Sequence, residues 1–366
     1  MVPLRDVATL QRGYDLPVQD RTPGEVPVFA ANGPVGSHNV PKVDGPGVVT
    51  GRSGTIGRVH HVDGAYWPLN TSLYVKDFHG NDSRYVYYLL RQMKLEQYGT
   101  GTGVPTLNRN IVHDVEVPVP PIEEQRRIAA ILDHADALRA KRREALAHLD
   151  ELTRSIFIDM FGDPTMNQMG WARATLGEVC GGRFRNGLSP STSGSVRAKV
   201  LTLSAVTGSG FDGSAFKVST FNATPPAGQS VSSHDLLVCR GNGNLKLVGR
   251  GYFAPHALPD VTFPDTIIAA TVDPERCDRA FIEQVWGTRI IRAQIESAAR
   301  TTNGTFKINQ TMLSGIEFPL PDLDRQTEFG KRKADIATIK EQHRVALAEL
   351  DALFSSLQSR AFRGEL

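Results

Sequence analysis

One stretch of 39 residues, from Ile122 to Met160, contains neither proline nor glycine. Within it, apolar or small side chains recur at alternating intervals of three and four residues, a pattern typical of a coiled-coil seam. At a rise of about 1.5 Å per residue, such a helix would be roughly 57 Å long, which exceeds the width of an ordinary globular domain. The apolar stripe of so long a helix needs a second helix to cover it.

The partner helix is in the same chain, because the pattern recurs 201 residues later. Gln125 maps onto Gln326, and the polar residue inside the seam, Arg142, maps onto the polar His343. The chain is therefore an internal repeat of one unit, a globular domain followed by a long helix. The predicted seam residues are Ile128, Ile131, Ala135, Leu138, Leu149, Leu152 and Ile156 in the first copy, and Ile336, Ile339, Leu350, Leu353 and Leu357 in the second.

The repeat predicts an α+β fold in which two globular domains alternate with two long helices. Short β-like stretches separated by Gly, Pro and Asn turns make up each globular segment, with a helix near its end. The second globular segment leaves the C-terminal end of one helix and enters the N-terminal end of the other. Since the ends of a compact domain lie near each other, we expect an intramolecular antiparallel coiled coil and a pseudo-two-fold relation between the copies. The predicted segments are 1–121, 122–163, 164–321 and 322–366; the predicted helices within the globular segments are 82–97 and 279–299.

Composition excludes several classes of protein. The hydrophobic fraction of 40% and the charged fraction of 22% are those of a globular protein. No apolar run approaches the ~20 residues of a membrane span, and the N-terminal stretch lacks the apolar core of a signal peptide. The three cysteines are scattered without a CxxC pair, which favours a reducing compartment. We therefore expect a cytoplasmic protein.

The formal net charge of +2 does not by itself indicate a nucleic-acid-binding protein. Of the four segments, only 164–321 carries a basic excess, with 15 basic and 11 acidic residues. Any contact with DNA must then come from local clusters or from a partner subunit.

Such clusters occur at matching places in the two repeats. Glycine-rich loops at 51–57 and 240–246 let the backbone approach a ligand, while their Arg, Ser, Thr and Asn side chains can donate to phosphates and base edges. Two basic-aromatic turns, QRGYD and GGRFRNG, form a second matched pair. The alternative interpretation is that these are turns with solvated arginines. The candidate DNA-binding residues are Arg12, Tyr14, Arg52, Ser53, Thr55, Arg58, Arg183, Arg185, Arg240, Asn242, Asn244 and Lys246.

Two further Thr/Gly stretches, 99–103 and 301–305, precede the last strand of each globular segment and suit either a phosphate contact or a structural loop. Searches for catalytic motifs fail. The sequence has no HExxH, no GxSxG, no methyltransferase tetrapeptide such as NPPY, and no lysine with Asp or Glu two residues before it. A GxGxxG match at 208–213 precedes a predicted strand rather than a helix, so it does not indicate a dinucleotide site. We expect no catalytic residue and no metal site.

The segment VPTLNRNIVHDVEVPVPPIEEQRRIAAILDHAD, residues 104–136, resembles the conserved region of type I restriction–modification specificity subunits. The final residues, SLQSRAFRGEL, are similar to the usual ending of that family, and so is the plan of two domains alternating with two helices. The resemblance covers essentially the full chain. Two departures, Arg325 and Gly330 in the second helix, leave open whether both helices present equal surfaces to partners.

The resemblance implies a non-catalytic DNA-binding subunit. Each target-recognition domain would read one half of a bipartite target, and the helical rod would set the spacer and recruit two modification subunits, which are adenine methyltransferases. Restriction subunits, which are ATP-dependent endonucleases, can join such a complex. No cofactor is expected in this chain, because S-adenosylmethionine, ATP and Mg²⁺ would be bound by the partner subunits. A protein-binding adaptor and an inactive paralogue stay open as alternatives, whereas the missing motifs disfavour an autonomous nuclease.

Overall fold

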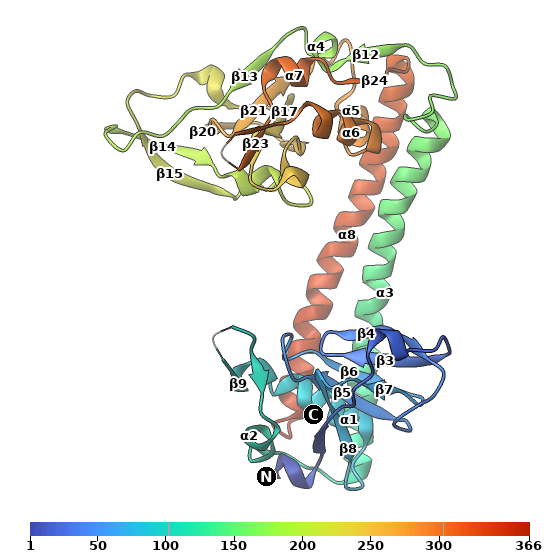
Figure 1. The fold of residues 1–366 in the computed structure, drawn as a ribbon. Helices are drawn as coiled ribbons and strands as arrows, with labels where there is room; N and C mark the ends of the chain where they lie inside the picture. The colour runs from blue at the N-terminus through green and yellow to red at the C-terminus, as the bar shows by residue number, and fades with distance from the viewer. Residues whose placement is uncertain (102, 303) are drawn as a thin grey trace. The chain divides into compact units, whose positions relative to one another are not determined.

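A computed structural model describes residues 1–101, 103–302 and 304–366. The chain forms two compact units. The first consists of Met1–Ala145 and His343–Leu366, and the second of Leu146–Gln342. Each unit therefore combines a globular part with pieces of both long helices (Figure 1).

The first unit is built on a four-stranded antiparallel sheet in the order β2-β8-β5-β6. Every residue of β5 is buried, because α1 covers one face of the sheet and a second sheet, in the order β4-β3-β7, covers the other. The elements are β2 (Thr9–Arg12), β3 (Val26–Ala30), β4 (Gly33–His38), β5 (Gly47–Gly51), β6 (Val59–Val62), β7 (Trp67–Pro68), β8 (Ser72–Asp77), α1 (Ser83–Gln92) and α2 (Arg109–His113). Two short antiparallel pairs complete it: β1 (Val2–Pro3) with β11 (Glu116–Val117), and β9 (Gly99–Thr100) with β10 (Thr106–Leu107).

The second unit repeats this plan with the sheet order β13-β21-β17-β19, covered by α5 on one face and by the sheet β15-β14-β20-β16 on the other. Its elements are α4 (Leu176–Val179), β13 (Phe184–Asn186), β14 (Val196–Leu201), β15 (Phe216–Phe221), β16 (Ser230–Val231), β17 (Asp235–Cys239), β19 (Gly251–Phe253), β20 (Leu258–Thr262), β21 (Ile267–Thr271), α5 (Arg279–Trp286), α6 (Arg289–Ala298) and α7 (Gln310–Ser314). The pair β12 (Arg173–Thr175) with β24 (Glu317–Pro319) matches β1 with β11, and the three-stranded sheet of β18 (Gly241–Asn242), β23 (Thr305–Lys307) and β22 (Arg300–Thr302) contains the counterpart of β9 with β10. The α+β internal repeat predicted from the sequence is confirmed.

Both predicted long helices are confirmed, as α3 (Ile122–Phe161) and α8 (Leu323–Ala361). In the first unit Arg139 donates to Asp351 at 2.6 Å, and Arg142 contacts His343 at 3.3 Å, so residue numbers rise on one helix as they fall on the other. In the second unit the ammonium of Lys340 contacts the carboxylate of Asp150, the counterpart of the Arg139–Asp351 pair. The helices are antiparallel within each unit.

The predicted seam holds only in part. Ile128, Ala135 and Ile336 are buried, and Ile131, Leu149, Ile156, Leu350 and Leu357 are half-buried. Leu138, Leu152, Ile339 and Leu353 are exposed, by 38% to 49% of their surface. Two paired helices can cover only part of an apolar stripe, and complete burial is seen where a globular domain packs on the helices as well. There the buried side chains include Leu132, Phe157, Phe329 and Phe354.

The two predicted helices in the globular parts end earlier or break. The helix expected over 82–97 ends at Gln92, because Lys94 takes a positive φ of 48°, and a 3₁₀ turn follows at Leu95–Tyr98. The helix expected over 279–299 is divided at Gly287 into α5 and α6. Asp82 and Asp278 cap the N-termini of α1 and α5, accepting from the backbone N–H of Tyr85 at 2.9 Å and of Ala280 at 2.7 Å.

A buried glutamine joins each long helix to its domain. Gln125 is 2% exposed; its Oε1 accepts from the Asp82 N–H at 2.9 Å, and its Nε2 donates to the Pro120 carbonyl at 2.9 Å. Gln326 is fully buried and makes the same two contacts, with the Asp278 N–H at 2.9 Å and the Pro321 carbonyl at 2.6 Å. One side chain thus links the start of the long helix, the preceding proline turn and the cap of the domain helix.

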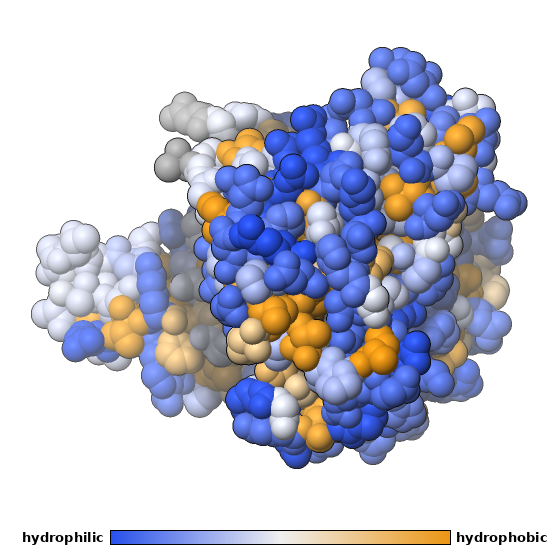
Figure 2. Space-filling model, turned by 90° about the horizontal axis from the view of Figure 1, so that it is seen from below, coloured by the Kyte–Doolittle hydropathy of each residue, from blue (hydrophilic) through white to orange (hydrophobic). Residues whose placement is uncertain are grey.

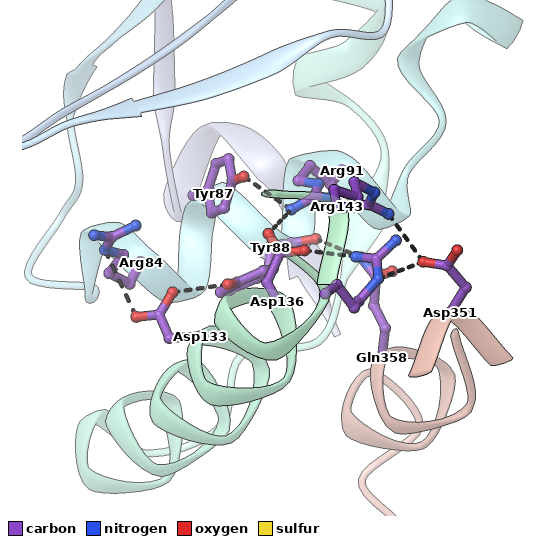
Figure 3. A network of polar contacts seen from close by, with 10 residues as sticks. Arg84, Tyr87, Tyr88, Arg91, Asp133, Asp136, Arg143, Asp351 and Gln358 are labelled. Carbon is purple, nitrogen blue, oxygen red and sulfur yellow. Dashed lines mark hydrogen bonds and ion pairs between the residues drawn. The ribbon is translucent and has the colours of Figure 1, made fainter. Parts of the chain in front are cut away.

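The polar network drawn in Figure 3 fixes the end of α8 to the first domain. From α1, the Tyr88 hydroxyl donates to Asp133 at 2.7 Å, and Arg91 donates to Asp136 at 3.1 Å. From α8, the Gln358 amide donates to the backbone carbonyl of Tyr88 at 3.3 Å. Hydrogen bonds and an ion pair therefore link helices α1, α3 and α8.

The two departures in the second helix have local causes. A Cβ at Gly330 would lie 3.1 Å from the carboxylate of Asp278, the residue that caps α5, so a glycine here leaves that cap in place. The guanidinium of Arg325 lies 5.4 Å from the ring centre of Trp171, a cation–π contact. Both residues serve the packing of the second domain.

The face drawn in Figure 2 is mostly hydrophilic, and its hydrophobic side chains lie in small separate groups. Scattered exposed apolar residues are normal on a folded protein. Among the helices of the described residues, none is long and apolar enough to cross a membrane.

We expect Gln125→Leu and Gln326→Leu to lower the free energy of unfolding by roughly 2–4 kcal/mol each, because each leaves a buried N–H and a buried carbonyl without a partner. Urea unfolding followed by circular dichroism measures the loss. The matched control is Gln342→Leu on the exposed surface of α8, which should change stability by less than about 0.5 kcal/mol. Equal effects of all three variants would contradict the proposed bracing role.

Candidate nucleic-acid interface

One edge of the main sheet gathers most of the residues predicted in the first unit. Strand β2 ends at Arg12 and β5 ends at Gly51, while β6 and β8 begin at Val59 and Ser72. Because neighbouring strands are antiparallel, these four ends meet at the same edge. The structure thus brings together five predicted residues: Arg12, Arg52, Ser53, Thr55 and Arg58.

The backbone holds the first glycine loop in one conformation. The Arg52 N–H donates to the Thr71 carbonyl at 2.9 Å, and the Arg52 carbonyl accepts from the Leu107 N–H at 2.7 Å. A Cβ at Gly51 would lie 1.7 Å from the carbonyl oxygen of Thr55, so only glycine fits at the start of the loop. Hairpin β9–β10 braces the loop, with a bridge between Ser53 and Thr106.

The three arginines of this edge have different roles. The Arg52 guanidinium is half-buried and donates to the carbonyl of Asn70 at 3.2 Å, so part of it is committed to the loop. Arg12 and Arg58 are exposed, and neither guanidinium has a hydrogen-bond or ion-pair partner within 1–101, 103–302 and 304–366. The N–H donors of Arg12 and Arg58 are available to an anionic ligand. Thr55, in the glycine loop, is exposed as well.

The second unit reproduces the anchored arginine atom by atom. The Arg240 N–H donates to the Thr266 carbonyl at 2.8 Å, and its guanidinium donates to the Asp265 carbonyl at 3.1 Å. Its own carbonyl accepts from the Ile308 N–H at 2.9 Å. Arg52 and Arg240 are therefore structural equivalents, each fastening a glycine loop to the same sheet edge.

The loop after Arg240 presents amide and ammonium donors. Asn242 Oδ1 accepts from the Asn244 N–H at 2.8 Å, and Asn244 Oδ1 accepts from the Lys246 N–H at 3.0 Å. These turns occupy the side-chain oxygens of Asn242 and Asn244, whose NH₂ groups are the remaining side-chain donors. The ammonium of the exposed Lys246 has no partner in the described part of the chain.

The structure corrects the predicted match between the two basic-aromatic turns, QRGYD and GGRFRNG. A Cβ at Gly13 would lie 2.3 Å from the Leu69 carbonyl oxygen, and one at Gly187 would lie 2.1 Å from that of Pro264, so these two glycines are the equivalent positions. QRG therefore matches RNG, and the counterpart of Arg12 is Asn186 rather than Arg183 or Arg185.

The two arginines of GGRFRNG serve the domain itself. Arg183 lies at the opposite end of β13, where it pairs with Asp273 at 3.2 Å. Arg185 pairs at 2.5 Å with the fully buried Asp235, which also accepts from Thr271 at 2.7 Å. A buried carboxylate left without its cation is costly, so Arg185 stabilises the second domain.

Tyr14 is also occupied. Its hydroxyl lies 2.9 Å from that of Tyr74, and the ammonium of Lys42 lies 5.0 Å from the centre of its ring. Desolvation raises the pKa of Tyr74, and the neighbouring Tyr14 raises it further, so the Tyr74 phenol stays neutral at physiological pH. The side chain belongs to the layer between the two sheets rather than to the loop edge.

Hairpins β9–β10 and β22–β23 lie in the Thr/Gly stretches, for which the sequence left a phosphate contact and a structural loop equally open. Of these stretches, Thr102 and Asn303 lie outside the described residues. Strand β23 pairs with β18 of the second glycine loop, as Thr106 of β10 bridges to Ser53 of the first. The recurrence of Asn108 as Asn309, which cap α2 and α7 directly after each hairpin, was the signal in the sequence.

The described residues contain no group of three or more His, Cys, Asp or Glu side chains placed to hold a metal ion. The three cysteines are buried. Burial raises the pKa of the Cys180 thiol to about 12 and that of Cys239 to about 11, so both stay protonated at neutral pH.

Comparisons with known proteins agree on one family. Residues 1–148 match the type I restriction modification DNA specificity domain. The chain is 31% identical over 142 residues to the type I restriction enzyme StySPI specificity subunit of Salmonella potsdam, covering 37% of this chain and 30% of that protein. It is 24% identical over 296 residues to the EcoKI specificity subunit of Escherichia coli K12, covering 76% and 63%. The chain thus spans less than two thirds of these relatives' own length.

Solved structures support the fold. The type I restriction–modification S subunit from M. genitalium superposes with a TM-score of 0.62 at 17% identity, covering 98% of this chain and 95% of that one. A chain from a study of complex assembly and conformational transition of the type I restriction–modification system gives 0.54 at 17% identity, covering 100% and 97%. Residues 1–148 are therefore similar to the type I restriction modification DNA specificity domain, and the whole chain resembles type I specificity subunits in sequence and fold.

Proposed function

We propose that this chain is the DNA-reading specificity subunit of a type I restriction–modification complex. Each unit reads one half of a bipartite target, and the long helices set the spacer and recruit two adenine methyltransferase subunits. Restriction subunits, which are ATP-dependent endonucleases, can join the complex. The chain performs no chemistry itself, and S-adenosylmethionine, ATP and Mg²⁺ are bound by its partners.

The observation that carries the proposal is the repeated loop edge. Arg52 and Arg240 make the same three contacts in two units whose loop sequences differ. Two domains that bind different half-sites need such a common loop position with different loop side chains. The exposed cations Arg12, Arg58 and Lys246 lie in or beside the loops, where they can contact the phosphates of a bound duplex. The side-chain amides of the loops can hydrogen-bond to base edges. A protein-binding adaptor or an inactive paralogue is the alternative.

The first test is co-expression with a type I modification subunit from the same organism in a host lacking adenine methylation, followed by genome-wide mapping of methyladenine. We expect a single gapped, asymmetric motif that appears only when both proteins are present. Methylation without sequence preference, or a stable complex with no methylation, would favour the adaptor or the inactive paralogue.

A second prediction separates the free cations from the anchored arginines. Arg58→Gln and Lys246→Gln should weaken DNA binding and lower the slope of log K against log salt by about 0.9 each, as for the loss of one phosphate contact. Their thermal stability should be unchanged, because both side chains are exposed. Fluorescence anisotropy over a salt series measures the affinity.

Arg52→Gln and Arg240→Gln are the matched comparison. Each removes a bond to a backbone carbonyl, so we expect a fall in melting temperature together with weaker binding. Loss of a base contact there would cost roughly 1–3 kcal/mol. A normal melting temperature in these two variants would show that the anchoring bonds do not hold the loops.

A further inference from the structure

The second unit has a β extension that the glycine loops do not include. Strand β14 pairs with β15 over its whole length but with β20 only at Lys199 and Val200. Strands β14 and β15 therefore form a two-stranded ribbon, whose outer residues, 196–198 and 219–221, extend beyond the sheet. In Figure 1 this ribbon lies on the side of the main sheet away from α5 and α6.

The ribbon is basic. Arg197, Lys199 and Lys217 are exposed, and none of them forms an ion pair with any residue that the structure describes. Strands β14 and β15 contain no carboxylate at all. Apolar surface lies among these charges, since Phe216 is 40% exposed and its ring centre lies 5.5 Å from the ammonium of Lys199. The strands of the corresponding sheet in the first unit, β3, β4 and β7, contain no Lys or Arg.

A groove of about 430 Å³ follows the outer edge of β15. The turn Pro190–Thr192 forms its other wall and is fixed by two bonds: the Ser191 N–H donates to the Thr220 carbonyl at 2.8 Å, and the Thr220 hydroxyl donates to the Ser191 carbonyl at 2.6 Å. Arg197 and Lys217 line the groove with several hydroxyl side chains, and no carboxylate is among the lining residues. Two cations beside hydroxyl donors suit a chain of phosphates.

The ribbon also begins at the candidate interface. The chain leaves the main sheet just after Gly187, the counterpart of Gly13, where Leu188 bridges to Pro264. Within four residues it forms the wall of the groove. The segment that forms this wall therefore starts at the candidate interface of the second unit.

We propose that the β14–β15 ribbon enters the major groove of the DNA at the second half-site, with Arg197 and Lys217 on the flanking phosphates. A two-stranded β-ribbon fits the width of the major groove of B-form DNA. The inference rests on the proposed function and assigns this unit a grip that the first unit does not have. Its two cations position the duplex and do not select bases.

The test compares Arg197→Gln/Lys217→Gln with the matched control Arg173→Gln/Lys76→Gln, which removes two exposed cations remote from the ribbon in sequence. Each is purified in complex with the methyltransferase. Binding is measured by anisotropy over a salt series, on a duplex with the mapped motif and on a shuffled duplex of the same composition. The ribbon variant should lower the slope of log K against log salt by about 1.8 on both duplexes, as expected for two lost phosphate contacts. The control, and the charge-keeping variant Arg197→Lys/Lys217→Arg, should retain the wild-type slope.

The outcomes separate the two proposals. An unchanged slope in the ribbon variant, with a wild-type complex that prefers its motif, overturns the ribbon proposal and leaves the proposed function standing. A wild-type complex that binds both duplexes alike overturns the proposed function. If the double variant melts earlier than wild type, the single variant Lys217→Gln decides the question, with an expected fall in slope of about 0.9.

Discussion

The structure depends most on a buried glutamine at the start of each long helix. An amide has both a donor and an acceptor, so one side chain can satisfy a proline-turn carbonyl and the N–H of a helix cap at once. Gln125 and Gln326 do this in the two units with the same geometry. Because an unpaired buried amide is costly, the domain helix and the long helix are held in one relative position. Under the proposed function, this fixed start of each long helix on its domain is what allows the helices to set the spacer between the half-sites.

The two units also share the way in which each glycine loop is held. The guanidinium of Arg52 or Arg240 donates to a backbone carbonyl, and the peptide N–H and C=O groups of the same residue bond to neighbouring backbone segments. The glycine loop is thereby fixed without help from the side chains that follow it. Those side chains, Arg58 in one unit and Lys246 in the other, can vary without loss of the loop, which is a requirement for domains that must recognise different sequences on a common scaffold.

Much of this could be predicted from the sequence because the information is periodic. The helices, their antiparallel pairing and the repeat all follow from the seam and its recurrence, and the pairs Arg139–Asp351 and Asp150–Lys340 are related by the same shift. The shift fails near QRGYD, because an insertion changes the offset, and similarity of residue type then suggested Arg183 in place of Asn186. The periodic pattern also predicted more burial along the seam than the structure has. Leu138 and Leu353 occupy seam positions, yet the pair of helices leaves both side chains exposed. Which cation pairs with a carboxylate, as Arg185 pairs with Asp235, depends on contacts between distant segments that no local pattern records.

The units differ most where their second sheets differ, and this has a physical consequence for binding. The three-stranded sheet of the first unit carries no basic residue on its strands, whereas the ribbon of the second carries three. The net charge of +2 is too small to provide long-range attraction over the whole chain, so each local group of cations decides the salt dependence of its own half. The basic excess of the second globular segment therefore includes three cations on this ribbon. Under the proposed function, the half-site bound by the second unit carries more of the electrostatic part of the affinity than the half-site bound by the first.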